Sequence, residues 1–77
     1  MIPLTNVPVG NRAQLIEVQD ALRSKLKAQG LHMGDYLRVL RVAPFGGPLL
    51  VEVNGREIAL GRAVAGKIFV ETECGSH

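Results

Sequence analysis

The segment from Gly30 to Pro48 constrains the fold of this chain more than any other part of the sequence. Gly30 is the kind of residue that ends a helix, and an apolar segment, Tyr36–Val42, follows a short turn. Residues 43–48 then read Ala-Pro-Phe-Gly-Gly-Pro. Because proline cannot donate to a sheet ladder and glycine reaches positive φ, this run predicts a rigid, exposed corner between two strands. It holds no catalytic group, so it indicates an architecture and not a chemistry.

Length and composition predict one small folded domain. The chain has 77 residues, of which 47% are hydrophobic and 21% are charged, which is far from the composition of a disordered chain. Only Tyr36, Phe45 and Phe69 are aromatic, so the core is expected to consist of Val, Leu and Ile. We expect a single domain over 1–77, with a core from about 10 to 71 and a flexible tail at 72–77.

Changes in hydrophobic spacing divide the first half of the chain into short elements. Two prolines and a glycine interrupt residues 1–10, which are expected to form an irregular lead-in. A strand is expected over Ala13–Val18. A helix is expected from Asp20 to Gly30, with the Asp20 carboxylate accepting hydrogen bonds from the first turn.

Beyond residue 35 the apolar residues alternate, which is typical of strands. Further strands are expected over Tyr36–Val42, 49–54, Arg56–Leu60 and Lys67–Glu71, with a brief helical turn at 61–66. The Asn54-Gly55 pair predicts a hairpin with a type I′ turn. Five short strands and one principal helix favour a small closed barrel, since closure removes the unpaired edges of an open sheet.

The order of glycine, apolar and proline positions resembles the ferrous iron transport protein A (FeoA) family. The loop at 43–48 is followed at the family's spacing by Ala59-Leu60, and then by an Ala-x-x-Ile-x-Val pattern that begins at Ala65. Further matching positions are Gly10, Leu26, Gly30, Gly34 and Val39. The resemblance implies a mainly β, SH3-like fold: a five-stranded barrel with one principal α-helix and a short helical turn before the last strand.

The same resemblance implies a cytoplasmic accessory protein of bacterial ferrous iron uptake that acts by protein–protein contact. The implied partner is the membrane GTPase and transporter FeoB, and the role needs neither enzyme activity nor a cofactor. Two other functions stay open. The SH3-like C-terminal module of metal-dependent transcriptional repressors resembles the same pattern. A small basic RNA-binding barrel agrees with a pI of about 9.1, although aromatic residues that could stack on bases are nearly absent.

The titratable residues form no recognisable catalytic set, because the carboxylates fall at turns or on outward strand positions. Cys74 and His77 supply two ligands for a soft metal, but a metal site needs three or four. We therefore predict no catalytic, cofactor or metal site. The single cysteine and the lack of a signal peptide favour the cytoplasm, and no apolar stretch approaches the roughly 18 residues of a membrane span.

A protein-docking surface is the remaining candidate site. Phe45 is predicted at the tip of a loop, where Pro44, Gly46 and Pro48 hold it outward and an aromatic ring can anchor a partner. The basic helix residues Arg23 and Lys27 mark the alternative docking surface. The net charge is only +2, so no nucleic-acid partner is expected. The short apolar stretches predict no direct insertion into a membrane, and self-association stays open.

Overall fold

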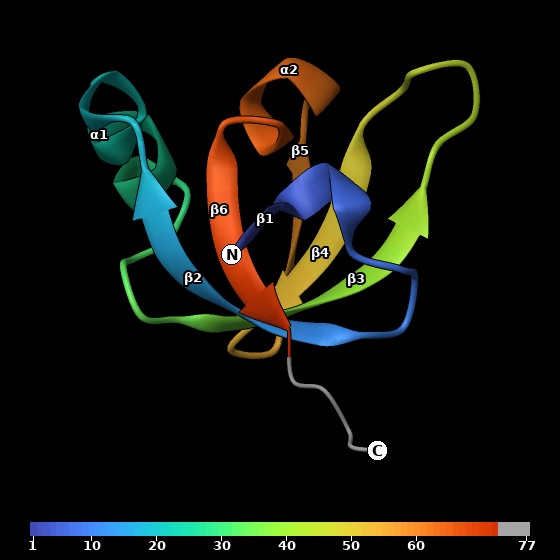
Figure 1. The fold of residues 1–77 in the computed structure, drawn as a ribbon, viewed down its shortest axis with the longest axis horizontal. Coiled ribbons are helices and arrows are strands. Elements are labelled where there is room, and N and C mark those ends of the chain that lie inside the picture. Colours follow the sequence, from blue (N-terminus) through green and yellow to red (C-terminus); the bar gives the residue numbers. More distant parts are fainter. Residues whose placement is uncertain (73–77) are drawn as a thin grey trace.

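The computed structural model describes residues 1–72, which form one curved antiparallel sheet with short helical segments around it (Figure 1). The strands are β1 (Ile2–Pro3), β2 (Arg12–Val18), β3 (Tyr36–Val42), β4 (Leu49–Val53), β5 (Arg56–Leu60) and β6 (Ile68–Thr72). The helical segments are η1 (Leu4–Asn6), α1 (Asp20–Ala28) and α2 (Arg62–Ala65). The strand order is β1-β6-β2-β3-β4-β5, so β6 lies between the first two strands.

The mainly β class, the principal helix and the helical turn before the last strand are confirmed. The closed, five-stranded barrel is not confirmed. The sheet has six strands, and within residues 1–72 no ladder joins the outer strands β1 and β5. The additional strand is β1, which pairs Ile2 with Val70 and Pro3 with Phe69. Proline is tolerated in β1 because this strand lies at the edge of the sheet, where no further strand needs a backbone donor.

The expectation of an irregular lead-in is also wrong. After β1, the 3₁₀ turn η1 buries Leu4 completely, and Val7 is only 4% exposed. Residues three apart lie on the same side of a 3₁₀ turn, so both side chains face the interior. The core therefore begins at Leu4 and not at residue 10.

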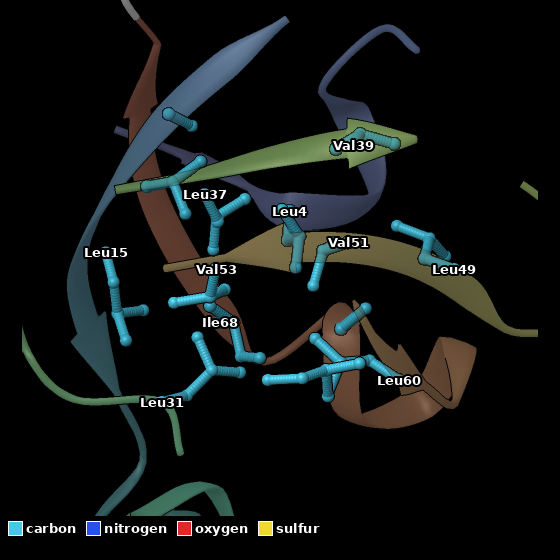
Figure 2. Close-up of a cluster of buried hydrophobic side chains, with 14 of the residues drawn as sticks. Leu4, Leu15, Leu31, Leu37, Val39, Leu49, Val51, Val53, Leu60 and Ile68 are labelled. Carbon is cyan, nitrogen blue, oxygen red and sulfur yellow. The ribbon is translucent and has the colours of Figure 1, made fainter. Parts of the chain in front are cut away.

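The buried core is aliphatic, as the composition predicts. Alternate residues of β4 are buried, and the matching faces of β2, β3, β5 and β6 turn toward the same interior (Figure 2). The largest fully buried side chains are those of Leu4, Leu15, Leu26, Leu37, Leu49, Leu60, Ile68, Val39, Val51, Val53 and Val70. No polar or charged residue of the described chain is buried, so the removal of aliphatic surface from water is the main stabilising contribution.

Two β-bulges bend the sheet around this core. The register between β2 and β6 shifts between Leu15 and Glu17, and the register between β3 and β4 shifts between Val39 and Arg41. In each case one residue of the longer strand has no partner opposite it. A bulge increases the local twist and bends its strand. The bulges therefore let a sheet of short strands enclose one interior.

Helix α1 begins at Asp20 and ends before Gly30, as predicted, but the cap at its start differs from the prediction. Gly30 has φ +95°; its N–H donates to the Lys27 carbonyl (3.0 Å), and the Leu31 N–H donates to the Leu26 carbonyl (2.9 Å). These two bonds form a Schellman motif, which turns the chain back and buries Leu31. Asp20 is not the cap that the sequence predicts. Gln19 occupies the cap position without a side-chain bond, and the Asp20 carboxylate lies 3.4 Å from Arg23 Nε instead.

Candidate docking sites

The loop between β3 and β4 holds Phe45 at the tip of a tight turn. The Gly47 N–H donates to the Pro44 carbonyl (3.1 Å), and the Ala43 N–H donates to the Pro48 carbonyl (3.0 Å). Phe45 has φ +59° and Gly46 has φ +74°, the two positive values that a type I′ turn requires. Two hydrogen bonds and two prolines thus brace a six-residue loop.

Phe45 is fully exposed, with a relative accessibility of 104%. Its ring contributes no buried area to folding, and its left-handed backbone is unfavourable for a bulky residue. An aromatic residue that stabilises neither the core nor its own turn is a candidate for intermolecular contact. The structure therefore places Phe45, Pro44, Gly46 and Pro48 together in one exposed loop, as the sequence predicts.

Sequence reasoning missed the part that Gly47 has in this loop. A Cβ atom on Gly47 would lie 2.7 Å from the Ala43 Cβ and 3.2 Å from the Pro44 carbonyl oxygen. The two sides of the loop approach too closely for any side chain at this position. The Gly46-Gly47 pair was the only sequence signal for this close approach. A pair of glycines does not indicate which of the two has no room for a side chain.

A second candidate site is a cavity of about 190 Å³ beside α1. Its floor is apolar and consists of buried side chains from β2, α1 and the segment after α1: Leu15, Val18, Leu26 and Leu31. Arg23 and Lys27 also line it, from successive turns of α1. The structure thus brings the two predicted basic residues together over an apolar floor, at a site separate from the Phe45 loop (Figure 1).

Two exposed residues after the helix, His32 and Met33, complete the lining of this cavity. The Asp35 carboxylate accepts from the His32 backbone N–H (2.9 Å) and lies 3.6 Å from His32 Nδ1, while the Asp35 N–H donates to the His32 carbonyl (3.1 Å). These contacts hold the turn that follows α1. Sequence reasoning missed the cavity because its lining comes from segments that only the fold brings together.

A third, polar concavity bears on the RNA-binding alternative. It includes Arg12, Tyr36 and Arg38, and the Arg12 guanidinium lies over the Tyr36 ring at 5.3 Å from the ring centre. Single-stranded RNA is bound chiefly by stacking of bases on aromatic rings. Because Arg12 covers a face of the ring that lines this concavity, the geometry gives the RNA-binding alternative little support.

No group of three or more His, Cys, Asp or Glu residues that could hold a metal ion occurs within residues 1–72. Cys74 and His77, the two ligands considered in the sequence analysis, lie outside the described residues. In the same part of the chain, no helix has both the length and the apolar character needed to cross a bilayer.

Comparison with known proteins assigns this small, SH3-like β fold to a family. The family model for the FeoA domain matches residues 2–72. The chain belongs to the FeoA domain family. The match begins at residue 2, which agrees with the inclusion of β1 and η1 in the fold.

Solved structures show the same relationship. A crystal structure of an iron uptake regulatory protein, FeoA, superposes with a TM-score of 0.81 at 30% identity, covering 92% of this chain and 94% of that one. The FeoA solution structure from Chlorobium tepidum gives 0.86 at 35% identity, covering 99% and 74%. The manganese regulator SloR gives 0.82 at 28% identity, covering 94% of this chain but only 34% of SloR. A comparison with curated protein sequences gives no match.

Proposed function

We propose that this protein is a cytoplasmic accessory component of bacterial ferrous iron uptake that acts by contact with an FeoB-type membrane GTPase. It has no catalytic role and no cofactor in this proposal. Family membership supports the place in iron uptake. The observation that carries the mode of action is the exposed ring of Phe45 on a braced turn.

The physical argument rests on the cost of ordering an interface. A side chain on a flexible loop loses conformational freedom when it docks, whereas the Phe45 loop is already restrained by two hydrogen bonds and two prolines. A buried aromatic residue at the centre of a small interface commonly contributes the largest share of the affinity. A single anchor of this kind gives a small domain specific contact of modest strength.

The test compares Phe45→Ala with wild type for binding to the purified GTPase in detergent. We expect the affinity to fall by roughly 5- to 150-fold, because one aromatic anchor contributes about 1–3 kcal/mol. The free energy of unfolding should stay within about 1 kcal/mol of wild type, because the ring buries nothing in the free protein. Val9→Ala is a matched control, since Val9 is also exposed, at 57%, and lies outside the loop.

Each outcome of this test has a defined meaning. Equal affinity of Phe45→Ala and wild type for the GTPase would remove the loop from the interface. If instead neither protein binds the GTPase at all, the proposed partner is wrong. The helix residues Arg23 and Lys27 remain the alternative docking surface, to be tested by Lys27→Glu in the same assay.

A second function is favoured by the similarity to SloR, which this chain matches over about a third of that protein's length. In this alternative the domain is a module that packs against the rest of a metal-dependent regulator. Capture of a DNA-binding regulator in place of the GTPase, with this protein as bait in a cell extract, would favour the alternative.

A further inference from the structure

The residues that line the cavity beside α1 are suited to bind an aromatic ring. Its floor of leucine and valine side chains is apolar, and Met33 at its edge supplies a flexible thioether, which makes favourable contacts with ring edges. Lys27 also lines the cavity and can bring its ammonium group to the face of a ring, whereas Nε of the neighbouring Arg23 lies 3.4 Å from the Asp20 carboxylate. An aliphatic ligand would use only the apolar floor.

The chain itself carries one aromatic side chain that is exposed enough to enter such a cavity. Tyr36 is covered by Arg12, and Phe69 is partly buried in β6, whereas Phe45 is fully exposed. The loop at 43–48 contains no charged residue. Insertion of Phe45 would therefore bring no like charge toward Arg23 and Lys27 and would desolvate no ion of the loop.

Phe45 cannot reach the cavity of its own molecule. The loop between β3 and β4 and the helix α1 lie at opposite ends of the longest axis of the molecule (Figure 1). We propose that Phe45 of one copy inserts into the α1 cavity of a second copy. This proposal does not depend on the identity of the membrane partner.

This contact joins two different surfaces, so it is heterologous. A heterologous contact leaves one loop and one cavity unused in every pair, and further copies add at both ends. The protein should therefore form chains whose length grows with concentration. Because one small anchor drives the contact, the dissociation constant is expected between about 10 µM and 1 mM. Self-association would also occupy the ring that the proposed function assigns to the GTPase.

The test uses two variants that each lack one half of the contact. Phe45→Asn removes the ring and keeps the cavity. The double variant Lys27→Glu with Met33→Glu keeps the ring and lines the cavity edge with carboxylates, which repel the negative face of the ring. Lys25→Glu is the control for the Lys27→Glu change, because it makes the same charge change on α1 at a residue that does not line the cavity.

Sedimentation equilibrium measures the average mass from about 10 µM to 1 mM, the range of the expected dissociation constant. Wild type and Lys25→Glu should rise progressively above the monomer mass of 8.3 kDa. Phe45→Asn alone, and the double variant alone, should remain monomeric. The average mass of an equimolar mixture of the two should rise toward twice the monomer mass and never exceed it, because each mixed pair has one intact ring and one intact cavity.

Three results would overturn the proposal. Wild type could stay monomeric throughout the range, or Phe45→Asn alone could associate as wild type does. The mixture of the two loss variants could also fail to form the mixed pair although wild type associates. None of these results bears on binding to the GTPase, so failure of this inference and failure of the proposed function are separable.

Discussion

At the scale of single residues, the chain contains two turns with the same backbone conformation. The first central residue suits a positive φ in one turn and does not suit it in the other. Asn54 and Gly55 have φ +53° and +80°, and this Asn-Gly pair is the preferred sequence for a type I′ turn. Phe45 and Gly46 adopt nearly the same pair of positive angles. Asparagine tolerates the left-handed conformation, whereas a bulky residue such as phenylalanine is strained in it. The loop between β3 and β4 therefore carries an unfavourable residue at its tip.

This contrast gives a prediction about stability. Phe45→Asn should raise the free energy of unfolding by about 0.5–1.5 kcal/mol, because it replaces a strained residue with one that favours the turn. Asn54→Phe should lower it by a similar amount for the same reason. Urea denaturation followed by circular dichroism measures both changes. A loss of stability in Phe45→Asn would show that the ring makes contacts within its own molecule.

At the scale of elements, the end of α1 is fixed by one glycine. Gly30 has φ +95°, and a Cβ atom at this position would also overlap the guanidinium of Arg56, the first residue of β5. The Schellman motif at Gly30 buries Leu31 and thereby places the segment that follows α1 against the floor of the cavity. The shape of the cavity depends on this motif.

We therefore expect Gly30→Ala to destabilise the protein by about 1–2 kcal/mol, since a left-handed residue with a Cβ is strained. Gly61→Ala is the control, because Gly61 has φ −58° and a Cβ there would contact nothing within 4 Å. Thermal unfolding of the two variants should separate them clearly. Equal melting temperatures would contradict the assignment of strain to Gly30.

The elements also show what the sequence can and cannot predict. Alternation and the Asn54-Gly55 pair were sufficient for the hairpin of β4 and β5, because both signals are local. The bulges in β2 and β3 were not predicted, because a change of register depends on the partner strand. Strand β1 was missed because two residues with a proline resemble a loop until β6 pairs with them. The exposed loop was predictable from its prolines and glycines, whereas the cavity beside α1 was not.

At the scale of the whole molecule, the two candidate docking sites lie at opposite ends of the fold and have complementary chemistry (Figure 1). One end presents an aromatic ring, and the other has a cavity with an apolar floor that Arg23 and Lys27 also line. A molecule of this kind can link a partner at one end to a second molecule at the other. Both contacts are expected to be weak individually, so their combined strength would depend on local concentration.

For the whole chain, we predict no stoichiometric metal site. We expect titration of the purified chain with Fe²⁺ or Zn²⁺ under reducing conditions to show only weak binding, because Cys74 and His77 supply two ligands and stable sites use three or four. Removal of residues 74–77 should abolish this binding. Tight one-to-one binding by calorimetry that survives the truncation would contradict the prediction.

The position of β6 in the sheet has a consequence for the order in which the molecule is made. Strands β1 and β2 are synthesised first, yet both pair with β6, whose last residue is Thr72. The hairpin of β4 and β5 can form from neighbouring residues, but the interior around Leu4 and Leu15 stays open until β6 arrives. During translation β1 therefore has no partner strand, and β2 can pair only with β3, until the chain has left the ribosome as far as residue 72.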